Sequence, residues 1–301
     1  METPRKFSLL KEPYLTTAAI GGIMTLMYAP LIIYWYHGWL EKSIGIEHEY
    51  FSHGVIGLPF AAYIAWTKRK DWLKLPEKFQ PVGAVLLGLA GAFFLSGIPD
   101  LINLSFPLIL AGLCLWFKGV AGLKLMRMPL IFVSLATPNH IPYLIQPLAL
   151  PIQRFIAGTA AFILMQLGVN LQLEDIYLYI GDRIVEVAPH CAGLKMLFTS
   201  IYVGLMLLQW TDVIKSRTKT VFFLLTAAFI SVTGNIIRNT VLTVFHGTGR
   251  EAAFHWLHEG WGGDLYSAAM LGLLVLLIWW IQNFFSSDGY DEGYREEIDP
   301  T

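Results

Sequence analysis

Charge is scarce in this sequence, and its scarcity excludes a soluble protein of this size. Charged residues make up 14% of the 301 residues, whereas soluble globular domains carry about 25%. Hydrophobic residues make up 55%, which is far too many for an intrinsically disordered chain. The formal net charge of -1 provides no basic surface for a nucleic acid. The composition therefore indicates a polytopic membrane protein, and no nucleic-acid partner is expected.

Cysteine is also scarce, because the chain has only Cys114 and Cys191. These two cannot form the disulfide framework of a small secreted protein. The HExxH zinc motif is absent, so neither a metal nor another cofactor is expected. Internal repeats, which many transporters carry, are absent as well. Single polar residues near the membrane surface are then the candidates for chemistry.

What the chain does have is a series of apolar stretches. A helix needs roughly 20 apolar residues to cross a bilayer. The stretches lie at 15–36, 52–67, 82–99, 101–117, 128–137, 152–169, 194–210, 220–245 and 265–285. The fifth is short and runs into Pro138, Pro142, Pro147 and Pro151. Because proline removes a backbone donor and breaks helices, we interpret 128–150 as a broken, re-entrant or interfacial segment.

The sequence thus predicts an all-α polytopic integral membrane protein with about eight transmembrane helices. Residues 1–285 are expected to form a single membrane domain, and residues 286–301 an acidic, disordered cytoplasmic tail. Lysine and arginine concentrate at the N-terminus and in loops near 68–78, 118–127 and 215–219. Since basic loops stay in the cytoplasm, both termini are expected there.

The segment 170–192 is then expected on the outer face. Within it, residues 171–187 alternate partly between apolar and polar types, with Gly181-Asp182 between two runs. This pattern predicts a small hairpin.

Cys191 has the surroundings of a reactive thiol. It lies where this outer segment ends and an apolar helix begins, within Val187-Ala-Pro-His-Cys-Ala-Gly-Leu-Lys195. The positive end of a helix lowers the pKa of a thiol and favours the nucleophilic thiolate. The alternative is a small apolar side chain at a helix end. Cys114 lies inside an apolar stretch without polar neighbours, and we expect it to be inert.

Arg238 is the second candidate, within Gly234-Asn-Ile-Ile-Arg-Asn239 near the outer end of an apolar stretch. An arginine inside a span costs about 2.5–3.5 kcal/mol on insertion scales, so it needs partners in the protein interior. The alternative is that it snorkels to the interface.

His255 and His258 form the third candidate, because they precede the last span and are spaced for one side of a helix. The neighbouring Trp256 and Trp261 also fit an ordinary interfacial aromatic belt. A thiolate, an imidazole and a guanidinium at one depth form a set suited to acyl transfer.

Several blocks of the sequence resemble motifs of the exosortase/archaeosortase family, and within it of the cyanobacterial branch, type B. The blocks are Cys191-Ala-Gly193 for Cys-Ser-Gly, Asn235-Ile-Ile-Arg238 for Asn-x-x-Arg, His258-Glu-Gly260 for the C-terminal His-to-Gly element, Phe51-Ser-His-Gly54, and Pro147-Leu-Ala-Leu-Pro-Ile-Gln153. Ala192 replaces the commoner serine of the first block. The histidine spacing also differs, so we favour His258 and keep His255 as the alternative.

The resemblance implies a membrane-embedded cysteine protease and transpeptidase. Cys191 would form a thioacyl-enzyme, with Arg238 as oxyanion stabiliser, His258 as acid and base, and supporting roles for Asn235, Gly193 and Gly260. The implied substrates are exported proteins with a C-terminal PEP-CTERM-type signal, which consists of a motif rich in proline and glutamate, one transmembrane helix and a basic cluster.

The implied location is the plasma membrane of a bacterium of the cyanobacterial branch, in contact with lipid and with the active site on the extracytoplasmic face. The competing interpretation is a non-enzymatic polytopic transporter or a surface-polymer assembly subunit. In that case Arg238 and the segment 128–150 would line a substrate path.

Overall fold

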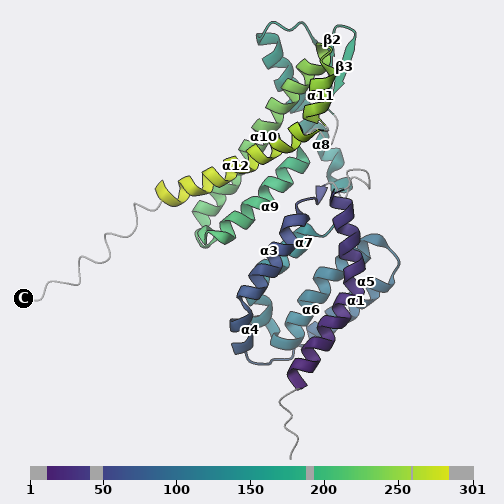
Figure 1. Cartoon of the computed structure of the whole chain (residues 1–301), viewed down its shortest axis with the longest axis vertical. Helices are drawn as coiled ribbons and strands as arrows, with labels where there is room; N and C mark the ends of the chain where they lie inside the picture. The colour runs from purple at the N-terminus through teal and green to yellow at the C-terminus, as the bar shows by residue number, and fades with distance from the viewer. Residues whose placement is uncertain (1–11, 41–49, 188–192, 259, 285–301) are drawn as a thin grey trace, which may run out of the picture. The chain divides into compact units, whose positions relative to one another are not determined.

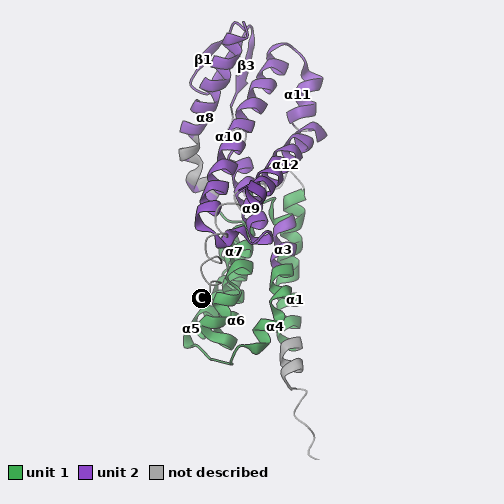
Figure 2. Cartoon of the chain, turned by 90° about the vertical axis from the view of Figure 1, so that its left-hand side faces the viewer, with its two compact units in different colours: residues 1–55, 62–139 green, residues 56–61, 140–301 purple. Residues whose placement is uncertain are grey.

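The computed structural model describes residues 12–40, 50–187, 193–258 and 260–284 of the chain. It is mostly helical, with one small sheet (Figure 1). The chain divides into two compact units (Figure 2). Unit 1 comprises residues 1–55 and 62–139, and unit 2 comprises residues 56–61 and 140–301. That residues 1–285 form one membrane domain stays a prediction.

Unit 1 is built from helices, most of which are rich in hydrophobic residues. They are α1 (Glu12–Leu40), most of α3 (Gly54–Thr67), α4 (Arg69–Lys74), α5 (Pro81–Leu95), α6 (Pro99–Leu125) and α7 (Arg127–Ala136). Pro81 and Pro99 begin α5 and α6, where a missing backbone donor costs nothing.

Two buried hydrogen bonds join α1 to α6 within unit 1. The Tyr28 hydroxyl lies 3.0 Å from Ser105 Oγ, and Trp35 Nε1 donates to Asn103 Oδ1 at 2.8 Å. Polar pairs of this kind hold apolar helices in one register.

Unit 2 is arranged around the long helix α10 (Arg217–Gly247), which packs against four others. These are α8 (Ile141–Gln166), α9 (Leu194–Trp210), α11 (Glu251–His258) and α12 (Trp261–Phe284), with the short η3 (Val213–Lys215) before α10. Fully buried alanines on α8, including Ala157, Ala160 and Ala161, allow close helix packing.

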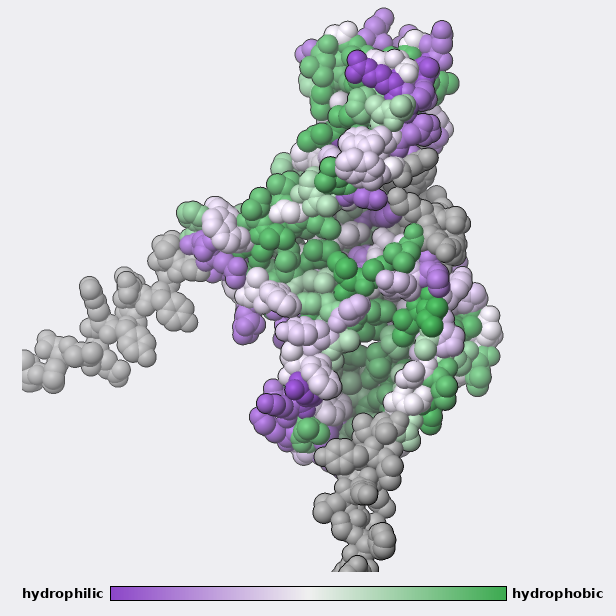
Figure 3. Space-filling model, viewed as in Figure 1, coloured by the Kyte–Doolittle hydropathy of each residue, from purple (hydrophilic) through white to green (hydrophobic). Residues whose placement is uncertain are grey.

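Four helical segments of the described residues are long and apolar enough to cross a membrane: Ala19–Leu40, Pro99–Leu125, Arg217–Gly247 and Trp261–Phe284. Shorter apolar helices cover Gly54–Thr67, Pro81–Leu95, Arg127–Ala136 and Leu194–Trp210. Large hydrophobic side chains stay exposed on the helices, for example Phe229 and Leu276. Hydrophobic residues cover much of the visible helical surface (Figure 3). These features fit a multi-pass membrane protein, while the predicted count of about eight spans is not confirmed.

The proline-rich segment differs from the prediction in one respect. A break between α7 and α8, at residues 137–140, agrees with a broken segment. The expected break does not extend over all of 128–150, because α8 begins at Ile141 and continues through Pro147 and Pro151. A proline removes only its own donor, and helices in apolar surroundings tolerate it when neighbouring groups compensate.

The predicted hairpin is confirmed and is extended by one strand, while its place on the outer face stays a prediction. β1 (Gln172–Glu174), β2 (Tyr177–Ile180) and β3 (Arg183–Glu186) form an antiparallel meander. Ile180 pairs with Arg183 across the turn at Gly181, whose φ of +58° favours glycine. Leu178 is fully buried in a core cluster with residues of α8, so the sheet is anchored to that helix.

Candidate active site

Gly193 and Asn235, two of the predicted supporting residues, are in close contact. Gly193 precedes α9 with a φ of +76°, which side-chain-bearing residues rarely adopt. A Cβ atom at Gly193 would lie 2.6 Å from Asn235 Cγ, so a larger residue cannot fit without displacement. Asn235 itself is 1% exposed. Cys191, the predicted nucleophile, lies outside the described residues.

Arg238 lies one turn beyond Asn235 on α10 and reaches the end of α11. Its Nη2 donates to the backbone oxygen of His258 at 3.2 Å and to that of Leu257 at 3.4 Å. These carbonyls end a helix and lack partners within it, and a cation near them is stabilising. Arg238 therefore holds the part of the chain that carries His258.

A second atom of Arg238 stands out. Within the described part of the chain, its Nε is buried and meets no hydrogen-bond acceptor. A buried charged donor is costly when unpaired, which makes this atom a candidate to bind a negatively charged group.

The two candidate histidines differ in their surroundings. The His255 side chain is exposed, whereas His258 is half-buried. The ring of His258 stacks on Phe254, with centroids 5.1 Å apart and planes inclined by 11°. His258 also lines a cleft of about 110 Å³, which His255 does not line.

This cleft brings together polar residues from three elements. Its walls come from β3, α10 and α11, and its lining residues are Ile184, Val185, Glu186, Asn239, Leu242, His246, Phe254 and His258. His246 was not among the residues selected from the sequence. The signal that could have found it is the short Gly247-Thr-Gly249 turn, which folds His246 back toward Glu251.

Gly260 allows the chain to turn from α11 into α12. Its N–H donates to the backbone oxygen of His255 at 2.9 Å. A Cβ atom at Gly260 would lie 2.8 Å from the backbone oxygen of Trp256. The glycine in the predicted His-to-Gly element thus has a geometric reason, while Glu259 beside it lies outside the described residues.

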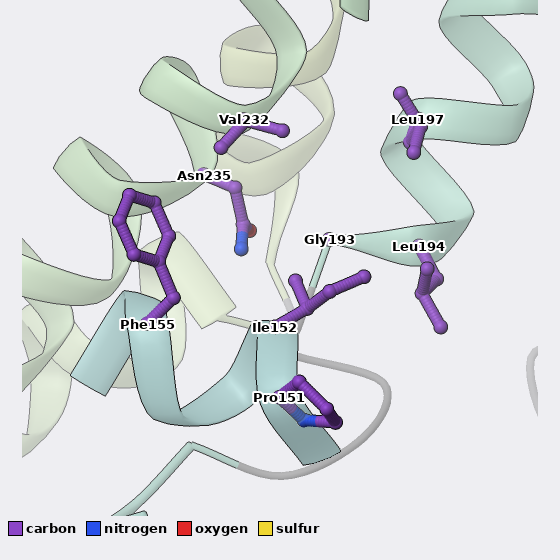
Figure 4. A pocket seen from close by; sticks show the side chains of 8 residues that line it. All are labelled: Pro151, Ile152, Phe155, Gly193, Leu194, Leu197, Val232 and Asn235. Atoms are coloured by element: carbon purple, nitrogen blue, oxygen red, sulfur yellow. The ribbon is translucent and has the colours of Figure 1, made fainter. Parts of the chain in front are cut away.

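A second, apolar cleft of about 290 Å³ adjoins Gly193 and Asn235 (Figure 4). It is lined by Pro151, Ile152 and Phe155 of α8, Gly193, Leu194 and Leu197 at the start of α9, and Val232 and Asn235 of α10. The Asn235 side chain points toward Ile152 and Gly193. Asn235 and Asn239, one turn apart on α10, therefore border the apolar and the polar cleft respectively.

Two other residues considered in the sequence, His53 of the Phe51-Ser-His-Gly54 block and Cys114, lie in unit 1. His53 is buried, and its Nε2 lies 3.1 Å from the Leu135 backbone oxygen. Cys114 is a buried thiol in α6, in surroundings that fit the expectation of an inert residue. Among the described residues, no group of three or more histidine, cysteine or acidic side chains could hold a metal ion.

The exposed apolar helices define an integral membrane protein with a polar site beside the ends of α10 and α11. The sequence pattern of the family described as transmembrane exosortase (EpsH) matches residues 39–275. The chain belongs to this family, and the matched range includes every candidate residue of the site. No curated protein and no solved structure matches the chain.

Proposed function

We propose that this exosortase is a membrane-embedded cysteine protease and transpeptidase that cleaves the C-terminal PEP-CTERM-type signal of exported proteins. Membership of the transmembrane exosortase family supports a sorting transpeptidase. The observation that carries the proposal is that two of the motif blocks, those of Gly193 and His258, contact the same turn of α10. Gly193 packs on Asn235, and Arg238 binds the carbonyl of His258.

Cys191 is the proposed nucleophile. It precedes Gly193 by two residues, and two residues of chain span at most about 7 Å. Because Leu194 begins α9, this thiol is also near a helix N-terminus, which favours the thiolate. The thiolate attacks the scissile carbonyl carbon, so a C–S bond forms and the carbonyl oxygen becomes an oxyanion.

Arg238 has two proposed tasks, which different nitrogen atoms perform. Nη2 holds the carbonyl oxygens of Leu257 and His258, and this fixes the end of α11. The buried Nε, which meets no acceptor among the described residues, is the proposed donor to the oxyanion. A preorganised donor is worth most where charge develops in the transition state.

His258 is the proposed acid and base, and His255 is the alternative. His258 first takes the proton of the Cys191 thiol, and when the C–N bond breaks, its imidazolium gives this proton to the leaving amine. Water or an amine then attacks the thioacyl group and releases the product. The cleft position of His258 supports this choice over the exposed His255. Asn235, Gly193 and Gly260 shape the backbone around these groups.

The proposed location is the plasma membrane of a cyanobacterial-type bacterium, with the enzyme assigned to type B. The basic loops favour a cytoplasmic side opposite the segment 170–192, so the site faces outward, where exported substrates are found. The exposed hydrophobic helix faces support contact with lipid.

The test is to express the protein with an exported reporter whose C-terminus carries a motif rich in proline and glutamate, an apolar helix and a basic cluster. Mass spectrometry of the mature C-terminus reports cleavage. We expect cleavage with the natural chain and with Cys114→Ser, but none with Cys191→Ser, because an alkoxide is far harder to generate than a thiolate. Cleavage that persists in Cys191→Ser would refute the cysteine mechanism, whereas a reporter that the natural chain leaves uncleaved would favour the non-enzymatic transporter or assembly subunit.

A further inference from the structure

The polar cleft contains a second imidazole besides that of His258. His246, in the last turn of α10, and His258, in the last turn of α11, both line it. Phe254 contacts both rings, with centroids 5.2 Å from His246 and 5.1 Å from His258. The two histidines therefore share one space, although they come from different helices.

His246 is held by a carboxylate. Its Nδ1 lies 3.3 Å from Glu251 Oε2, and Arg183 of β3 donates to the other oxygen of Glu251. Arg183 Nη1 also donates to the backbone oxygen of His246 at 3.2 Å. One arginine thus ties the sheet to the turn between α10 and α11 and fixes both members of the pair.

This pairing selects one tautomer of His246. The hydrogen bond from Arg183 lowers the pKa of Glu251 below its usual value, so the carboxylate is ionised at neutral pH and can only accept hydrogen bonds. The proton of a neutral His246 then resides on Nδ1, and Nε2 is left as an acceptor. A carboxylate that orients the first nitrogen of an imidazole in this way prepares the second to act as a base.

His246 and His258 are both half-buried, but they differ in how their ring nitrogens are placed. The side chain of His246 is 30% exposed, whereas Nδ1 of His258 is buried. Glu186, which lines the same cleft, provides a negative charge that attracts a cationic amine. An amine that enters the cleft therefore meets both an imidazole and a carboxylate, those of His246 and Glu186.

We propose that His246, oriented by Glu251, is a second proton-transfer residue that acts when the thioacyl-enzyme is resolved, while His258 acts when it is formed. This inference rests on the proposed function. In the resolving step, the O–H bond of water or the N–H bond of an amine breaks, and its proton moves to His246 Nε2. A C–O or C–N bond forms at the acyl carbon, the C–S bond to Cys191 breaks, and His246 returns the proton to the thiolate.

The test follows the thioacyl-enzyme itself, with the reporter described above as the probe. A thioester between the reporter and the enzyme is detected on gels without reducing agent as an adduct that hydroxylamine cleaves. In His246→Gln we expect this adduct to accumulate and turnover to fall about 10²-fold, the lower end for loss of a general base. His258→Ala should form no adduct. His37→Gln, a change at an exposed histidine of α1, should behave like the natural chain.

Two further variants keep the inference testable if His246→Gln folds poorly. Glu251→Gln should also accumulate the adduct, because a neutral amide no longer imposes the tautomer. In His246→Gly, added imidazole should restore turnover of the preformed adduct, which a purely structural role would not allow.

The outcomes separate this inference from the proposed function. If His246→Gln matures the reporter at the natural rate, or forms no adduct as expected for His258→Ala, the second role is wrong and the cysteine mechanism stands. If the Cys191→Ser variant still processes the reporter, the mechanism fails at its first step, and the role of His246 fails with it.

Discussion

Replacement of Arg238 by lysine separates its charge from its shape. Both side chains are cationic, but arginine presents a planar set of donors, and lysine presents one ammonium group on a flexible stem. In the structure, Nη2 is engaged with two carbonyl oxygens at 3.2 and 3.4 Å, while Nε is buried without an acceptor among the described residues. A single Nζ cannot occupy both positions.

The expected magnitude follows from this division. Lysine can still bind the end of α11, where a cation is stabilising, so Arg238→Lys should fold and insert. It loses the separate donor for the oxyanion, and loss of one such donor costs about 10²–10³-fold in rate, or about 2.7–4 kcal/mol. The initial rate of reporter processing in membranes with matched protein levels measures this loss.

A matched control is Arg154→Lys on α8. Arg154 forms an exposed ion pair with Asp175, and exposed pairs contribute little, so processing should stay close to the natural rate. If Arg238→Lys were equally active, the guanidinium would serve only as a charge at the end of α11, and its proposed role in oxyanion binding would be refuted.

Two further predictions concern the choice between His258 and His255 and the contact between Gly193 and Asn235. His258→Ala should abolish processing of the reporter, whereas His255→Ala should reduce it only in part. The reporter assay, with protein levels checked by blot, measures both variants. The reverse result would exchange the roles of the two histidines. Gly193→Ala should lower both the folded protein and its activity, because the new Cβ would lie 2.6 Å from Asn235 Cγ in a left-handed conformation that costs about 1–2 kcal/mol. Thermal unfolding in detergent measures the loss of stability. The control is Gly272→Ala, because Gly272 has open space around its Cα. Equal stability of the two variants would contradict the argument.

Sequence reasoning could find Arg238 because a charge in an apolar stretch must have a partner. It could not identify that partner, because the carbonyl oxygens of Leu257 and His258 are backbone atoms without a sequence signature. The contact between Gly193 and Asn235 was equally hidden, since it joins positions 42 residues apart in the chain. Motif positions were available from the sequence, and their contacts were not.

The errors in the predicted fold have the same cause, because a local sequence pattern does not show which segments pack together. Prolines 147 and 151 favoured a helix break, but the surrounding packing decides whether a helix tolerates a proline, and α8 passes through both. The strand Gln172–Glu174 was not separated from the hairpin because its side chains are all exposed, so it has no alternation of buried and exposed residues. Its pairing with β2 alone defines it.

His246 shows most clearly why single-residue reasoning is incomplete at this site. In the sequence it follows the apolar stretch 220–245 and has the position of an ordinary interfacial residue. Its significance depends on Glu251, five residues later, and on Arg183 in a strand that precedes α9. Helix α10 carries Asn235 and Arg238 on adjacent turns and His246 about two turns further on, so each meets a different neighbour: the start of α9, the end of α11, and the sheet. The chemistry proposed for this exosortase thus depends on one rigid helix that aligns three segments, and a change that alters the helical register between Arg238 and His246 would separate groups that no single motif contains.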